Sequence, residues 1–287
     1  MPQPESALST LGESNPAENL GLLAEHAFGI AGKACAGCNG YHALWGYERL
    51  AGIKNPSFEA DRDIVEPLIR AHAGKRILIA GAADAGLLAM TAMAMRAQPV
   101  PITVSDRCGT PLSVCRAYAQ AHGLDVTTAK VDLTQAPLEL RHDLAFAHNI
   151  LMLIPLDRHP AFLRNIRASL ASGGTFVLVN RVRLSKTTAE RLPPSHYAQR
   201  ILDALKQRDV VLPESEAAFR GRLEAYAEAQ HVWSDAVVTE DHVETLLQQA
   251  GFTVAERVEH FRRTSIPDRD GGAPMTLPTH IYVARAA

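Results

Sequence analysis

A short apolar run breaks into a turn of small residues in the stretch Lys75-Arg76-Ile77-Leu78-Ile79-Ala80-Gly81-Ala82-Ala83-Asp84-Ala85-Gly86. The apolar run has the length and β-branched content of a buried strand, and a helical pattern resumes directly after the turn. A strand, a glycine-containing turn and a helix N-terminus together direct backbone N–H groups at a bound ligand. The stretch therefore predicts a nucleotide-binding βα turn.

Beyond this turn the sequence alternates between strand-like and helix-like segments. We expect strands at 77–80, 102–105, 126–131, 144–148 and 175–180. Helical segments of crossover length are expected between them at 87–96, 111–122 and 156–170. Strands that alternate with such helices form an open parallel sheet.

The bulk composition excludes several classes of protein. The 287 residues are 47% hydrophobic and 21% charged, with a formal charge of −2, so there is no overall positive field to hold nucleic acid. The polar first 20 residues read as neither a signal peptide nor a membrane span. Four cysteines are too few for a secreted disulfide scaffold. We expect a cytoplasmic protein with reduced thiols and without a nucleic-acid or membrane partner.

Four further segments follow the turn in a recognisable order. Ser105-Asp106-Arg107 ends the second expected strand, and Val131-Asp132-Leu133 ends the third. The fourth strand is carried by Asp143-Leu144-Ala145-Phe146-Ala147-His148-Asn149, and the entry to the fifth by Leu170-Ala171-Ser172-Gly173-Gly174-Thr175-Phe176-Val177-Leu178-Val179. In order and spacing, roughly residues 64–287 resemble the class I S-adenosylmethionine-dependent methyltransferases of small molecules.

The resemblance implies an α/β fold with a Rossmann-like, mostly parallel sheet of seven strands, the last of them antiparallel. It divides the chain into a helical N-terminal cap (1–72), a cofactor-binding core (73–183), a helical insertion after strand five that would act as a substrate lid (184–241), and a C-terminal helix and β-hairpin that complete the core (242–287). Short helices are expected at 19–50 and one amphipathic helix at 58–72. Residues 1–15 and 266–278 are expected to be disordered.

The resemblance also implies S-adenosyl-L-methionine as the cofactor. Gly81, Ala82, Ala83 and Gly86 would contact its methionine moiety. A carboxylate at Asp106, with Arg107 beside it, can accept hydrogen bonds from both ribose hydroxyls. Asp132 and Leu133 would meet the adenine edge, although Asp132 could instead cap a turn. His148 would line the cofactor site and is the first candidate for a catalytic base.

The glycine turn departs from the family pattern. Alanines at 83 and 85 replace glycines, and Ile79 stands where an acidic residue is expected. Asp84 is a candidate substitute for that acid.

A cluster just before the core is the candidate acceptor site. In small-molecule methyltransferases the N-terminal helices line the acceptor pocket, so the resemblance assigns substrate binding to Tyr41, His42, Trp45 and Arg49, together with Asn149 and Arg181 at strand ends. The same cluster could equally be a packing interface. The acceptor atom is an oxygen, nitrogen or carbon of a small metabolite, and assembly as a homodimer is left open.

Three alternatives remain at this point. Gly81-x-Ala83-x-x-Gly86 also approximates the dinucleotide fingerprint, with Asp106 20 residues beyond Gly86, which would suit an NAD-dependent oxidoreductase. The missing acid at Ile79 would suit a repurposed, non-methylating cofactor binder. Cys35-x-x-Cys38 with His42 has spacing that could hold zinc, but no fourth ligand is obvious and no metal is predicted.

Overall fold

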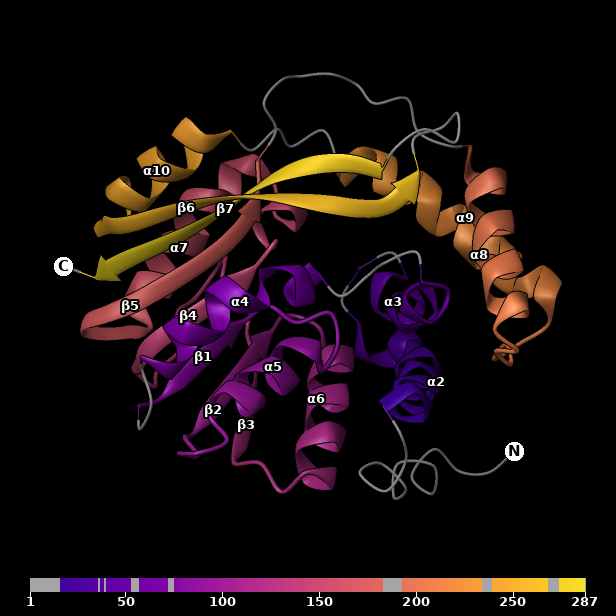
Figure 1. Cartoon of the computed structure of the whole chain (residues 1–287), viewed down its shortest axis with the longest axis horizontal. Helices are drawn as coiled ribbons and strands as arrows, with labels where there is room; N and C mark the ends of the chain where they lie inside the picture. Colours follow the sequence, from indigo (N-terminus) through magenta and orange to yellow (C-terminus); the bar gives the residue numbers. More distant parts are fainter. Residues whose placement is uncertain are drawn as a thin grey trace.

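The computed structural model describes residues 16–35, 37–38, 40–52, 57–71, 75–182, 193–233, 239–267 and 274–286. Its centre is a seven-stranded sheet in the order β3-β2-β1-β4-β5-β7-β6 (Figure 1). The strands are β1 (Ile77–Ala80), β2 (Ile102–Asp106), β3 (Val126–Lys130), β4 (His142–His148), β5 (Leu170–Arg181), β6 (Phe252–Pro267) and β7 (Pro274–Ala286). Strand β7 is antiparallel to both β5 and β6, while β1 to β5 run parallel. The predicted sheet, including its antiparallel last strand, is confirmed.

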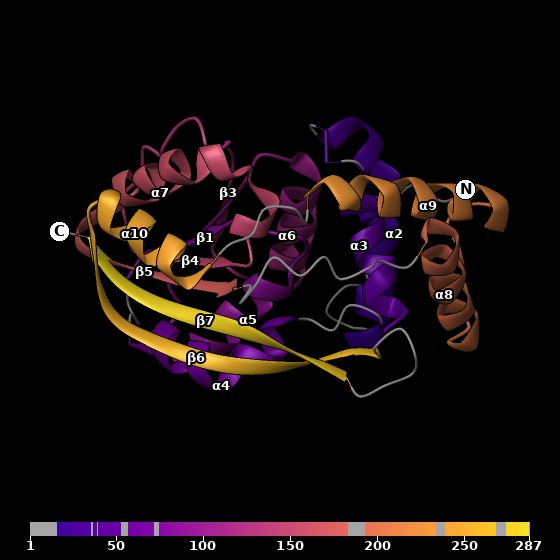
Figure 2. The same cartoon turned by 90° about the horizontal axis from the view of Figure 1, so that it is seen from above.

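Helices cover both faces of the sheet because successive side chains of each buried strand point to opposite faces. Ile77 and Ile79 of β1 face α4 (Ser57–Arg70), α5 (Gly86–Ala94), α6 (Gly109–Ala121) and part of α2 (Pro16–Ala34). Leu78 and Ala80 face α7 (His159–Ala168) and α10 (Glu240–Gln249). Figure 2 shows α7 and α10 on one side of the sheet and α4 on the other.

A third apolar core lies outside the sheet. Helices α2 and α3 (Tyr41–Leu50) of the N-terminal cap pack with α8 (Pro194–Gln207) and α9 (Glu216–Trp233) of the insertion. Aromatic rings join the two parts, with the Tyr47 and Phe219 centroids 5.2 Å apart. The cap and the insertion therefore share one core beside the carboxyl end of the sheet (Figure 1).

Three elements, α2, α7 and β5, differ clearly from their expected bounds. Helix α2 is one helix of 19 residues rather than a short one, because Gly29 and Gly32 weaken the helical signal without ending the helix. Helix α7 begins at His159, since Leu156–Arg158 forms a separate 3₁₀ turn before Pro160 at the helix start. Strand β5 begins at Leu170, five residues before its expected start at 175.

The prediction of disorder at 266–278 is wrong at both ends of that segment. Strand β6 continues to Pro267 and β7 starts at Pro274, because the two strands pair with each other over most of their length. Residues 1–15 lie outside the described residues.

Candidate functional site

The carboxyl ends of β1 and β4 mark the point where the strand order reverses direction. Open α/β sheets bind their ligands at this switch point. Gly81, which follows β1, has a φ of 84° and donates its N–H to the Ser105 carbonyl at 2.8 Å. A Cβ at this position would lie 2.5 Å from Ile150 Cδ1. The backbone conformation therefore favours glycine at residue 81, and an added Cβ would also displace the Ile150 side chain.

Asp106 lies at the end of β2, next to this turn. Its Oδ2 accepts the Ala82 N–H at 3.1 Å, and its Oδ1 accepts the Cys108 N–H at 2.7 Å. Burial raises the pKa of Asp106, and the positive potential of His42 and the two N–H donors oppose that rise. Each carboxylate oxygen keeps a further lone pair for a ligand hydroxyl. Ala82 thus joins the predicted cofactor turn directly to the predicted ribose-binding carboxylate.

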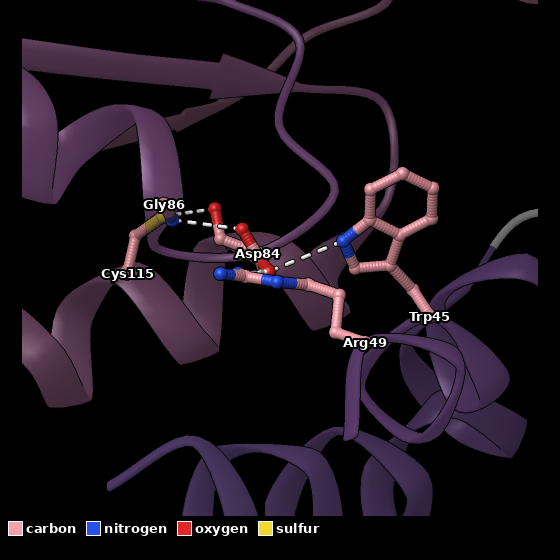
Figure 3. A network of polar contacts seen from close by, with 5 residues as sticks. All are labelled: Trp45, Arg49, Asp84, Gly86 and Cys115. Carbon is pink, nitrogen blue, oxygen red and sulfur yellow. Dashed lines mark hydrogen bonds and ion pairs between the residues drawn. The ribbon is translucent and has the colours of Figure 1, made fainter. Parts of the chain in front are cut away.

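Asp84 links the turn to the N-terminal cap (Figure 3). Its Oδ2 accepts hydrogen bonds from Trp45 Nε1 at 3.1 Å and from Arg49 Nη1, both on α3. Its Oδ1 accepts the Gly86 N–H at 2.7 Å, where α5 begins. The candidate substitute for the missing acid is therefore paired with an arginine of the cap.

A cavity of about 270 Å³ lies beside this link, between the turn, the cap helices and α5 and α6. Predicted residues His42, Trp45, Arg49, Ala83 and Gly86 belong to its lining. The remaining lining residues are Leu20, Leu23, Ala24, Ala27, Gly46, Asp84, Ala85, Ala89, Val114, Tyr118 and His122.

Tyr41 lies outside that lining, in the third apolar core. Its ring is 5.2 Å from Trp45 and 6.4 Å from Tyr226, centroid to centroid. Burial raises the pKa of the Tyr41 hydroxyl well above its usual value. Its surroundings are those of a packing residue between cap and insertion.

A buried polar cluster lies at the ends of β4 and β5. His148 Nε2 is 2.8 Å from Asp61 Oδ2, and the two side chains are only 5% and 1% exposed. Asn149 Nδ2 lies 3.2 Å from His148 Nδ1. An amide that donates to Nδ1 assigns the imidazole proton to Nε2, which then donates to Asp61. The result is a carboxylate–histidine pair at the edge where the base was predicted.

Asn149 and Arg181 complete this edge. Asn149 has a φ of 53°, and its Oδ1 accepts the Arg181 N–H at 2.9 Å. Burial lowers the pKa of the Arg181 guanidinium, and the nearby Asp61 carboxylate opposes that shift. The structure therefore joins the predicted residues His148, Asn149 and Arg181 in one cluster, and His148 bonds to Asp61, which was not predicted.

Asp61 lies on the amphipathic helix expected at 58–72, but it is not among the predicted site residues. Its position carried a stronger signal, because Asp61 precedes the fully buried Val65 and Ile69 by four and eight residues. This spacing places a carboxylate on the apolar face of α4, where an acid needs a partner.

The third strand end has a different geometry. Asp132 Oδ1 accepts the Thr134 N–H at 2.9 Å and the Thr134 hydroxyl at 2.7 Å, so this side chain caps its own turn. Leu133 is buried, and Arg107 is exposed. The other oxygen, Asp132 Oδ2, has a long contact of 3.5 Å with Gln135 Nε2. It can therefore accept a hydrogen bond from a further donor.

Sequence comparisons give no relatives. No protein-family model matches the chain. No curated protein matches it either.

Solved structures do match. The [4+2]-cyclase SpnF is 15% identical with a TM-score of 0.54, over 85% of this chain and 93% of SpnF. The N-methyltransferase NodS from Bradyrhizobium japonicum WM9, in complex with S-adenosyl-L-homocysteine, is 16% identical with a TM-score of 0.50, over 86% of this chain and 98% of NodS. TehB from Haemophilus influenzae is 14% identical with a TM-score of 0.50, over 78% of this chain and 62% of TehB.

This chain has the class I S-adenosylmethionine-dependent methyltransferase fold. The methyltransferase fold differs from the dinucleotide-binding fold, whose order 3-2-1-4-5-6 has no antiparallel strand inserted between the fifth and sixth. Here β7 occupies that place, which removes the fold-level support for an NAD enzyme. The fold alone does not set the reaction, since its matches include a protein named as a cyclase.

Among the helices that the structure describes, none is long and apolar enough to cross a membrane.

Proposed function

We propose that this protein transfers the methyl group of S-adenosyl-L-methionine to a small-molecule acceptor. The observation that supports the proposal is the hydrogen bond from Ala82 N–H to Asp106 Oδ2, because it joins the glycine turn at the switch point to the carboxylate that would bind the ribose. Gly81, Ala82, Ala83 and Gly86 would hold the methionine moiety. Asp106 and Arg107 would hold the ribose, and Asp132 and Leu133 the adenine.

The bound cofactor supplies an activated methyl group that an acceptor atom takes by direct displacement. The protein then has to align the acceptor, exclude water and, for some acceptors, remove a proton. His148 would accept that proton at Nδ1, where Asn149 now donates a hydrogen bond. Asp61 would stabilise the resulting imidazolium through Nε2, as an acid does in a nucleophile–histidine–acid triad.

The size and walls of the cavity favour a compact acceptor. A volume of about 270 Å³ is at the lower end of ordinary ligand pockets and too small for a polymer. Its polar lining includes the predicted residues His42, Trp45 and Arg49 beside Asp84, Tyr118 and His122, so recognition would combine aromatic faces with the Arg49–Asp84 ion pair. None of the four cysteines, each within the described part of the chain, forms a disulfide, in keeping with a cytoplasmic enzyme.

Calorimetry with the Asp106→Asn variant tests cofactor binding. The variant keeps the shape of the side chain and removes its charge, so S-adenosylmethionine and S-adenosylhomocysteine should bind about 1.5–3 kcal/mol more weakly, roughly 10- to 150-fold. Asp125→Asn, an exposed aspartate before β3, is the matched control and should bind as the wild type does. Equal affinities of Asp106→Asn and wild type, or binding of NAD alone, would overturn the proposal.

A second candidate is a cofactor binder that does not methylate. It is favoured by Ile79 in place of the expected acid and by the pairing of Asp84 with Arg49. Incubation with methyl-labelled cofactor and a metabolite extract separates the two candidates. Label in a small molecule establishes the transferase and reveals the acceptor, whereas tight binding with no transfer establishes the binder.

A further inference from the structure

Three of the four cysteines of this chain converge on one histidine. Cys35 and Cys38 lie between α2 and α3, His42 is in the first turn of α3, and Cys108 joins β2 to α6. Their ligand atoms, three sulfurs and one ring nitrogen, all lie within 4.8 Å of one another. The convergence brings together segments more than 60 residues apart in the sequence. Cys108 is the fourth ligand that the spacing of Cys35, Cys38 and His42 lacked.

The backbone around Cys38 is shaped for a thiolate. Gly37 and Gly40 have φ values of 70° and 79°, which turn the chain around the sulfur. The backbone N–H groups of Gly40 and His42 donate to the Cys38 sulfur. Amide donors of this kind stabilise the charged form of a thiol, which is the form that binds metals.

The imidazole is oriented toward the sulfurs. His42 Nδ1 lies 3.4 Å from Cys35 Sγ, so Nδ1 is the nitrogen that faces the cluster. Cys38, His42 and Cys108 are buried, and Cys35 is half-buried with the Thr110 hydroxyl 3.1 Å from its sulfur. A closed, largely buried set of this kind leaves no open position for a substrate.

We propose that Cys35, Cys38, His42 and Cys108 form a structural zinc site. Zn²⁺ prefers four-coordinate tetrahedral sets of thiolate and imidazole, with Zn–S distances of about 2.3 Å and therefore sulfur–sulfur separations of about 3.8 Å. The ligand atoms would have to close by only about 1 Å to reach this geometry. Mg²⁺ and Ca²⁺ require oxygen ligands, which this set does not offer. Binding releases the protons of the three thiols and leaves His42 neutral, with its proton on Nε2.

The zinc would fasten the cap to the sheet beside the cofactor site. Three ligands belong to the cap, and the fourth, Cys108, donates its N–H to Asp106 Oδ1 at 2.7 Å. The ion would therefore fix the junction that positions the proposed ribose-binding carboxylate. A metal that binds only the folded chain also adds to the stability of the fold.

Elemental analysis and cobalt substitution test the site on the full chain. We expect one zinc ion per chain after desalting under reducing conditions. Anaerobic replacement by Co²⁺ should give thiolate-to-metal charge-transfer bands together with the visible bands of tetrahedral cobalt. In Cys108→Ser the charge-transfer intensity should fall by about a third, because two of three thiolates remain. Cys115→Ser, a buried cysteine of α6 outside the cluster, is the matched control and should keep both zinc and spectrum.

The site would be ruled out if the reduced wild type bound no metal, or if the charge-transfer intensity of its cobalt form corresponded to two thiolates or none. An unchanged spectrum in Cys108→Ser would also rule it out. A Cys35–Cys38 disulfide in metal-free protein prepared without oxidant would also overturn it. If Cys108→Ser does not fold, the wild-type spectrum decides alone, because its intensity counts the thiolates. Metal content can be measured whether or not the chain binds S-adenosylmethionine.

Discussion

The two halves of the sheet's carboxyl edge hold their polar groups in different ways. At β1 and β2, backbone N–H groups of adjacent turns fix Asp106, and both donors come from the local βα connections. At β4 and β5, His148 is paired with Asp61, which lies 87 residues earlier on α4. The first half is therefore built by local chain geometry and the second by tertiary packing. The two halves should respond differently to mutation.

The largest effect is expected from Asp61→Ala. Removing a buried carboxylate leaves the groups that it compensates without a partner, at a cost of about 1–3 kcal/mol for a neutral donor and about 3–5 kcal/mol for a cation. Here both His148 and the buried Arg181 would lose their carboxylate. Urea unfolding of wild type and variant at neutral pH measures the difference.

Glu244→Ala is the control for this change, because it breaks an ion pair at the surface. Arg257 Nη1 and Glu244 Oε1 are 2.8 Å apart, with side chains 41% and 34% exposed. Solvent screening limits such pairs to roughly 0–1 kcal/mol. If Asp61→Ala cost no more than this control, the second half of the edge would not depend on its buried pair.

The same contrast explains what the sequence could predict. The strand at Ile77–Ala80 and the turn after it are encoded by one run of consecutive residues, and Asp106 ends the next strand. The hydrophobic pattern and the spacing therefore predicted their positions. Asp61 and Cys108 acquire their partners only when α4 packs against β4 and the cap packs against the β2–α6 junction. No local pattern contains that information, although a carboxylate on the apolar face of α4 was a readable sign of a partner.

Fold boundaries follow the same rule. The pairing of β6 with β7 extends both strands into a segment rich in proline, glycine and aspartate, where local propensity predicts disorder. Helix α2 continues through two glycines because Leu23 and Ala27 pack on the sheet-side core while Ala24 packs on the cap. In each case tertiary contacts outweigh a weak local preference.

Gly81→Ala should give the next largest effect and tests the local half. A φ of 84° costs an L-residue about 1–2 kcal/mol, and the new Cβ, 2.5 Å from Ile150 Cδ1, adds strain. We expect a loss of about 2–4 kcal/mol in unfolding free energy. Affinity for S-adenosylmethionine should fall with it, since the turn is the proposed methionine contact.

Gly123→Ala separates these two causes. Gly123 has a φ of 60° with no atom within 4 Å of an added Cβ, so only the conformational cost of about 1–2 kcal/mol applies. In a Gly81→Ala, Ile150→Val double variant, loss of the Ile150 Cδ1 atom should restore part of the stability, giving a non-additive cycle. Equal costs at the two glycines would show that the turn is not constrained by Ile150.

The smallest expected effect is a pH dependence of the unfolding free energy that comes from the side of the molecule at β4 and β5. His159 is buried after β4, and its Nε2 donates to the carbonyls of Leu151 and Ile154, each at 2.9 Å. Burial lowers its pKa from 6.5, so below pH 6.5 the unfolded chain takes up a proton more readily than the folded one. The stabilisation that results from this difference in the His159 pKa is complete above pH 6.5 and is lost as the pH falls toward the pKa of the folded state. Burial lowers the pKa of His142, on β4, in the same direction.

Urea unfolding between pH 7.5 and 5 in wild type and His159→Gln measures this contribution. The glutamine keeps a donor and removes the titration, so the variant should be less stable at pH 7.5 but lose less on acidification. His196→Gln, with an exposed side chain on α8, should follow the wild-type slope.

The pH dependence of stability that Asp106 contributes has the opposite sign, because a raised carboxyl pKa favours the folded state as the pH falls. Asp106→Asn should therefore steepen the acid loss that His159→Gln reduces, and equal slopes in the two variants would contradict these opposite pKa directions.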